Sequence, residues 1–291
     1  MKNYTLLLFI VFLYTACKHV NTENADNTYT EAQGHQVSEQ EIHSIYHRFP
    51  SPEEMLRVIN KAHLEYSEGL VNSVENVEKY FNSGEQALNL GIYTADLAYL
   101  TLYGKHNESG AYFEAVFNLS EKLRVSSAFE ISLLKNVQNN LTNPDSLQVF
   151  SDKAFSQLSD YLIKNNKEKS LAVISVGGFI EALYLSIMLS GDFNEENILI
   201  QRIADQKLVL ENIINYVSSF NDEDLVKTIE PVYTIREVYN ELIFKDEKTE
   251  VTRGEDGNLI VKGGKRLVIS EEQYLKLKAA TLQARNSITQ N

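Results

Sequence analysis

The chain has 291 residues, 43% of them hydrophobic and 10% aromatic, and a formal net charge of −13. Such a composition is typical of a globular protein and excludes a largely disordered chain. The acidic balance offers no basic stripe to phosphates, so it argues against nucleic acid as a partner and against polybasic docking on anionic lipid. The single cysteine, Cys17, excludes an internal disulfide and a cysteine-based metal site.

The amino terminus has the pattern of an export signal over residues 1–16. Lys2 supplies the charged region, and residues 6–14 form an apolar run that is too short to span a bilayer as a helix. Thr15-Ala16-Cys17 follows at once and resembles the lipobox of bacterial lipoproteins. In that family the chain is cleaved before the cysteine, and the cysteine is acylated. The resemblance implies a lipid anchor of the palmitate type on Cys17, although Tyr14 stands where the family prefers Leu.

The alternative is an ordinary cleaved signal with an incidental cysteine. Lys18 follows the cysteine, where some bacteria place an Asp that retains a lipoprotein in the inner membrane. We therefore expect an outer-membrane protein that faces the periplasm, with exposure on the cell surface as the alternative. The membrane, reached through Cys17, is then the first expected partner, and a protein of the cell envelope is the second.

Residues 17–50 are polar and predict an acylated cysteine followed by a disordered tether. His43 and His47 stand four apart, which would place them on one face of a helix as two metal ligands. A third ligand at useful spacing is missing, and Pro50 disfavours a helix there. We predict no metal site and no cofactor.

Residues 51–291 predict a single, all-α domain. Ser51-Pro52 is typical of a helix start, with proline in the first turn. Apolar residues at helical spacing extend this first helix to Leu70. Further helices are expected at 71–81, 111–123, 127–139, 143–164, 194–220 and 221–244, the last with a start or kink at Pro231.

The fold is expected to be a multi-helix bundle or helix-pair array around two apolar core helices, 87–104 and 172–191. The second is long enough to span a bilayer, but Glu181 near its middle favours the centre of a soluble domain. Gly91, Gly177 and Gly178 predict a close contact between helices, with a local break in the helix as the alternative, because glycine is otherwise costly inside a helix. The two segments also align with an offset of 85 residues, so an internal duplication is an alternative reading.

Residues 249–269 change character and predict a small β-hairpin with a turn at 254–257 and a second turn at Gly263-Gly264. This hairpin is interpreted as a covering flap, with a partner-binding edge as the alternative. Ser270 and Gln273 then form a capping box for a last helix over 271–288.

No phosphate loop, zinc-protease motif or nucleophile elbow occurs, so no catalytic residue is assigned. One constellation on the two core helices could form a ligand site, consisting of Tyr93, Asp96, Tyr99, Glu181 and Tyr184. The alternative is structural, with each acid accepting hydrogen bonds from a tyrosine or a helix amino terminus.

The lipobox, Ser51-Pro52, the segment 87–99 and the closing hairpin with its Ser270 cap together resemble helical lipoproteins of Bacteroidota-type bacteria. That family has no assigned reaction. The leading hypothesis is therefore a membrane-anchored binding or scaffold module of unknown ligand. The competing hypothesis is a hydrolase or lyase that uses Asp96 and Glu181 as an acid pair.

Overall fold

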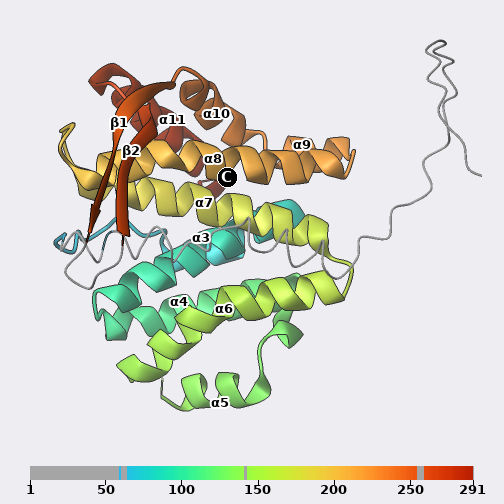
Figure 1. The fold of residues 1–291 in the computed structure, drawn as a ribbon. Coiled ribbons are helices and arrows are strands. Elements are labelled where there is room, and N and C mark those ends of the chain that lie inside the picture. The colour runs from blue at the N-terminus through green and yellow to red at the C-terminus, as the bar shows by residue number, and fades with distance from the viewer. Residues whose placement is uncertain (1–58, 60–63, 141–142, 254–258, 291) are drawn as a thin grey trace, which may run out of the picture. The chain divides into compact units, whose positions relative to one another are not determined.

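The computed structural model describes residue 59 and residues 64–140, 143–253 and 259–290, which all fall in one compact unit. Figure 1 shows this part as a set of packed helices with one β-hairpin. The predicted fold class, all-α with a small hairpin near the C-terminus, is confirmed for these residues. The elements are α3 (Ser83–Leu102), α4 (His106–Lys122), α5 (Ile131–Asn139), α6 (Pro144–Lys164), α7 (Glu168–Ser190), α8 (Ile198–Ser219), α9 (Glu223–Thr228), α10 (Pro231–Asn240), β1 (Ile243–Arg253), β2 (Leu259–Val268) and α11 (Glu271–Thr289), with short 3₁₀ helices at Val74–Lys79 and Ser126–Ala128.

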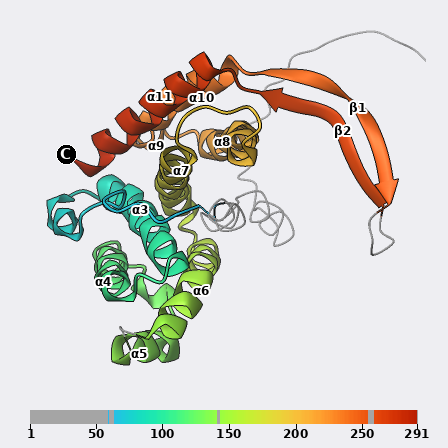
Figure 2. The same cartoon turned by 90° about the vertical axis from the view of Figure 1, so that its left-hand side faces the viewer.

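Helices α3 and α7 are the two predicted core helices, and they pack against each other at the centre of the domain. In both ribbon views α4 and α6 lie on one side of this pair, and α8, α10 and α11 lie on the other (Figures 1 and 2). α7 is the one described helix that is long and apolar enough to cross a membrane, yet 94% of its most apolar window is buried inside the domain. Its apolar surface is therefore satisfied by neighbouring helices.

The glycines at the crossing of α3 and α7 fix how closely the two helices approach. A Cβ on Gly91 would overlap the backbone carbonyl of Ile174, and one on Gly177 would overlap that of Leu88. The predicted close helix contact is confirmed at these two glycines. The backbone approach explains why alanine, the better helix former, is absent from both positions.

Several predicted boundaries differ from the structure. Residues 221–244 form two helices, and Pro231 begins the second, because proline is favourable in a first turn and lacks the amide needed inside a helix. Residues 194–197 precede α8 as a turn, and Asn197 caps the helix by accepting from the amide of Leu199. Residues 71–81 contain only the 3₁₀ helix Val74–Lys79.

The hairpin begins at Ile243, inside the range 221–244 that is predicted to be helical, and it pairs Ile243 with Val268. The second turn predicted at Gly263-Gly264 is wrong, because β2 runs through both residues. Gly264 instead adopts a positive φ of 97° opposite Glu247, beside an irregularity in the register. Glycine adopts such a left-handed backbone conformation without steric cost. The turn predicted at 254–257 lies outside the described residues.

Figure 2 shows that the hairpin extends beyond the helices, which does not fit a covering flap. Its base is held by α8, where the side-chain amide of Gln201 donates to the carbonyl of Leu267. Leu267 is buried there, whereas Ile243 and Phe244 at the base of β1 keep 70% and 52% of their surface exposed.

The first predicted helix does not reach Leu70. Ile59 is helical and buried, but residues 64–73, which we call the strap, have no regular secondary structure. Residues 51–58, where that helix was predicted to begin, lie outside the described part. The strap needs partners for backbone groups that a helix would have satisfied internally, and these partners define the site below.

Candidate functional site

Asp96 on α3 and Glu181 on α7 lie side by side in the interior, although they are 85 positions apart in the sequence. Neither side chain has any exposed surface. The close backbone contact at Gly91 and Gly177 lies one to two helical turns from these acids and brings the two helices together. The close crossing thus places two acids in the centre of the domain, where each needs a compensating partner.

Arg285, on α11, is that partner for Glu181. Its Nε donates to Oε2 at 2.7 Å and its Nη2 to Oε1 at 2.9 Å, which is the paired geometry of a strong arginine–carboxylate contact. The guanidinium also lies over the ring of Tyr184, 4.2 Å from its centre. Although burial lowers the pKa of Arg285, the charge of Glu181 more than offsets it and keeps the guanidinium protonated.

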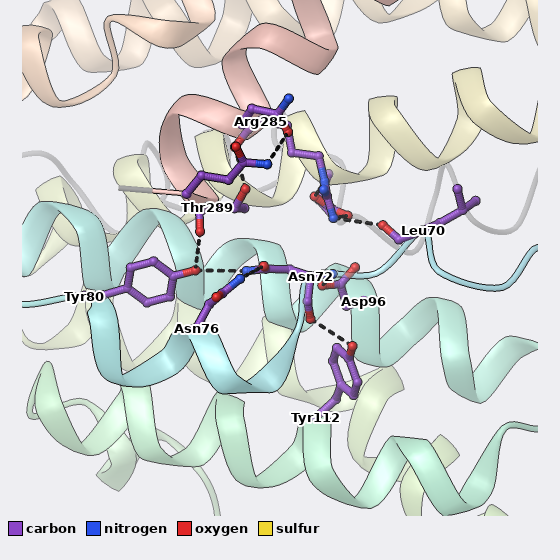
Figure 3. Close-up of polar contacts among 11 residues, drawn as sticks. Leu70, Asn72, Asn76, Tyr80, Asp96, Tyr112, Arg285 and Thr289 are labelled. Atoms are coloured by element: carbon purple, nitrogen blue, oxygen red, sulfur yellow. Dashed lines mark hydrogen bonds and ion pairs between the residues drawn. The ribbon is translucent and has the colours of Figure 1, made fainter.

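The same cluster binds the backbone of the strap. Nη2 of Arg285 donates to the carbonyl of Leu70 at 2.8 Å, and the amide of Asn72 donates to Oδ2 of Asp96 at 3.0 Å. Figure 3 shows Arg285 pointing toward Leu70, with Asp96 beside Asn72. One acid and the arginine therefore hold the strap directly, from two different helices.

The other oxygen of Asp96, Oδ1, is buried without a hydrogen-bond donor among the described residues. Burial raises the pKa of Asp96 well above its usual value, and the negative charge of Glu181 raises it further, while Arg285 lowers it. A proton on Oδ1 would satisfy this atom by donating to Glu181. With that proton in place, a neutral Asp96 would lie beside the Glu181–Arg285 ion pair, and the cluster would carry no net charge.

Four tyrosine hydroxyls complete the attachment of the strap. Each donates to a strap carbonyl, over distances of 2.6–3.1 Å, and the pairs are Tyr93 with Ser73, Tyr99 with Ser67, Tyr103 with Leu64 and Tyr112 with Asn72. Buried backbone carbonyls need such donors. The strap is thus held by side chains of α3 and α4, and by Tyr103 directly after α3, in place of a helical hydrogen-bond ladder.

A second contact joins the strap region to the end of the chain. The side chain of Asn72 donates to the hydroxyl of Tyr80 at 3.0 Å, and that hydroxyl donates to the carbonyl of Thr289 at 3.3 Å (Figure 3). Asn89 of α3 also donates to the carbonyl of Ile288. The last turn of α11 is therefore tied to the strap and to α3.

The five residues predicted as a ligand site divide into two groups. Asp96 and Glu181 meet, and Tyr184 joins them through its contact with Arg285. Tyr93 and Tyr99 bind the strap, and their hydroxyls are occupied by its backbone. The structural alternative expected a tyrosine or a helix amino terminus as the donor to each acid, whereas the donors among the described residues are Arg285 and the backbone amide of Asn72.

Sequence reasoning missed Arg285 and Asn72. A signal for Arg285 was present, because it lies at helical spacing from the apolar residues Tyr274, Leu277 and Ile288, on the face that α11 buries. An arginine on such a face requires a buried acid, and Glu181 was the strongest candidate. No comparable signal marks Asn72, whose role depends on the irregular path of the strap.

A cleft on the described part of the chain lies apart from the cluster. The cleft, of about 390 Å³, is lined by α3, the α9–α10 junction and the end of α11, including Glu85, Lys227 and Ser287. It contains none of the five predicted site residues. In the described part of the chain no group of three His, Cys, Asp or Glu side chains could hold a metal ion. His43, His47 and Cys17 lie outside that part.

Comparison of the chain with known protein families, curated proteins and solved structures gives no match.

Proposed function

We propose that this chain is a lipid-anchored binding or scaffold module of the cell envelope, held in the outer membrane through Cys17 and facing the periplasm. The non-catalytic part of this proposal rests on the burial and the hydrogen-bond partners of the acid pair. Asp96 and Glu181 have no exposed surface, and their described partners are Arg285 and the strap backbone. Acid–base catalysis needs a carboxyl group within hydrogen-bond reach of a substrate.

The anchoring part rests on the sequence of residues 1–18. A signal-like apolar run ends at Thr15-Ala16-Cys17, and Lys18 follows. Acyl chains add about 0.8 kcal/mol of membrane affinity per buried CH₂, so more than one chain on Cys17 supplies stable anchoring. A polar stretch up to Pro50 then gives the domain reach from the membrane surface.

The binding part is supported by the hairpin. An isolated two-stranded ribbon is at best marginally stable in water. This ribbon extends past the helices, with Ile243 and Phe244 exposed at its base (Figure 2). Its two-stranded sheet includes no third described strand, so a partner could pair with an edge or pack on a face of the ribbon.

The anchor is tested by mass spectrometry of the mature amino terminus, purified from the native host. We expect a chain that begins at an acylated Cys17, and we expect Cys17→Ala to yield an unacylated precursor or a released protein. A free, unmodified terminus at any residue after Cys17 would overturn the anchored part of the proposal.

The binding role is tested with a shortened hairpin. Replacing residues 246–265 by Asn-Gly closes a two-residue turn after the Lys245–Arg266 pair and leaves the buried Leu267 in place. In a deletion strain we expect this variant to fold and to localise normally but to fail in complementation. The control is Asp96→Asn, which we expect to complement. A folded Asp96→Asn protein that fails while the shortened hairpin succeeds would favour the hydrolase or lyase hypothesis instead.

A further inference from the structure

The buried cluster contains two acids and one base. Both oxygens of Glu181 are bound by Arg285, so those two charges compensate each other. Asp96 has no second cation in the cluster, and its Oδ1 has no donor among the described residues. The arrangement is therefore balanced only while Asp96 is protonated, because an unpaired charge in a dry interior is very costly.

The other groups around Asp96 cannot replace that proton. Besides Glu181 and Arg285, the titratable side chains of the described residues that act on Asp96 or are acted on by it are all phenols. They come from α3, α4, α7 and the segment after the first 3₁₀ helix, and they are Tyr93, Tyr112, Tyr184 and Tyr80. Burial raises the pKa of each of these tyrosines, so they stay neutral. Ionisation of Asp96 consequently leaves one net negative charge in the cluster.

The strap is the part of the fold able to relieve that charge. Asp96, Glu181 and Arg285 are on long helices packed in the core, whereas residues 64–73 are irregular and hold several exposed positions, including Glu65, Glu68 and Gly69. Backbone held by individual side-chain bonds opens more readily than packed helices. Lifting Leu70 away from Arg285 and Asn72 away from Asp96 would admit water to the carboxylate.

We infer that residues 64–73 form a latch that stays closed while Asp96 holds its proton and opens when Asp96 releases that proton to solvent. Closure is the state described here, with Asn72 bound to Asp96 and Leu70 bound to Arg285. Because Asn72 also donates to Tyr80, which contacts Thr289, opening would also remove one support of the contact that holds the end of α11. Rising pH would thus loosen the strap and weaken the attachment of the last turn of α11.

The test is amide hydrogen exchange of the full mature protein in detergent, from pH 6 to pH 9.5, corrected for intrinsic exchange rates. The informative amide is that of Asn72, and amides of α8 around Ile213 serve as the reference. If opening releases one proton, the opening constant rises about tenfold per pH unit between the pKa values of the open and closed states. We expect that slope at Asn72 and none at Ile213.

Asp96→Asn is the matched variant, since its amide accepts from Asn72 through oxygen and donates to Glu181 through nitrogen without titrating. We expect its Asn72 protection to be independent of pH and higher than that of the wild type at pH 9. Equal slopes in the two proteins would overturn the inference. So would a wild-type slope that is absent, or one shared equally by α8, which would indicate global unfolding. Should Asp96→Asn not fold, the wild-type comparison of Asn72 with Ile213 still decides.

Discussion

Gly91 faces the backbone of Gly178 so closely that a Cβ on Gly91 would lie 2.5 Å from the Gly178 amide nitrogen. Real Cβ atoms do not approach a backbone to that distance, so α3 and α7 cross with main chain against main chain. This crossing brings Asp96 and Glu181 together, and with them the cluster that holds the strap. The close approach of the two helices therefore also determines which side chains meet in the buried cluster.

Gly177→Ala tests that crossing. The new methyl group would overlap the carbonyl of Leu88, and a backbone carbonyl cannot move aside alone. Overpacking of this kind costs about 1–3 kcal/mol, and here it outweighs the gain of about 1 kcal/mol in helix propensity. We expect a loss of unfolding free energy in urea titrations.

Gly84→Ala is the matched control. Its Cβ would meet the methyl group of Thr228 at 2.9 Å, which is a side-chain contact near the start of α3. We expect this variant to stay within about 1 kcal/mol of the wild type, because a side chain can shift where a backbone cannot. Equal urea midpoints for the two alanine variants would show that the crossing is more compliant than the structure implies.

The two core helices were predictable because their patterns are local. An almost uncharged run of helical length indicates burial on all sides, and glycines inside it indicate close approach. The sequence also placed Asp96 and Glu181 on the facing helices. Whether the two acids meet was open, since their contact depends on the rotation of α3 and α7 about their axes.

The strap could not be predicted, because its conformation is set by distant partners. Residues 56–70 carry apolar residues at helical spacing, and a helix was the natural expectation. Tertiary contacts override that local pattern: Tyr99, Tyr112 and Arg285 supply donors for strap carbonyls from positions 32, 40 and 215 residues away. Sequence periodicity carries no information about such long-range hydrogen bonds.

Tyr112→Phe tests the attachment of the strap. The change removes one donor and leaves the carbonyl of Asn72 unsatisfied in a buried position. Such a loss costs about 1–3 kcal/mol. We expect lower stability together with faster cleavage by a nonspecific protease in the strap. Tyr66→Phe is the control within the strap itself. Its hydroxyl bond to Glu108 of α4 is exposed, so water can replace it, and we expect a change within about 0.5 kcal/mol. Unchanged proteolysis of Tyr112→Phe would contradict the assigned role.

Asp96→Asn should change how global stability depends on pH. Burial and the neighbouring Glu181 raise the pKa of Asp96 in the folded state above its ordinary value of 3.8, so the folded protein binds a proton that the unfolded chain releases. That contribution is fully present below the unfolded pKa and is lost as pH rises toward the folded pKa, by about 1.4 kcal/mol per pH unit.

The asparagine variant does not titrate at this position. Its stability relative to the wild type should therefore increase steadily from pH 4 upward until the wild-type Asp96 ionises. Urea denaturation of both proteins at five pH values measures the difference, in which contributions from all other groups cancel. A constant difference across the range would mean that Asp96 has an ordinary pKa in the folded protein.

The last prediction concerns the unequal dependence of the cluster on its two charged partners. Arg285→Met leaves an ionised Glu181 beside Asp96 with no cation among the described groups, and breaking a buried ion pair in this way costs about 3–5 kcal/mol. Glu181→Gln leaves Arg285 next to Asp96, which can then ionise and take over as counter-ion. We expect Glu181→Gln to lose less stability than Arg285→Met at pH 7, and we expect the stability lost by Glu181→Gln to become smaller as pH rises.

The double variant Glu181→Gln/Arg285→Met closes a mutant cycle, and its stability should exceed that of Arg285→Met alone because no buried charge remains uncompensated. Urea midpoints at pH 6 and pH 8.5 measure all three. Equal losses for the two single variants at both pH values would show that Asp96 does not exchange its proton for the arginine, and that the three groups act as independent contacts.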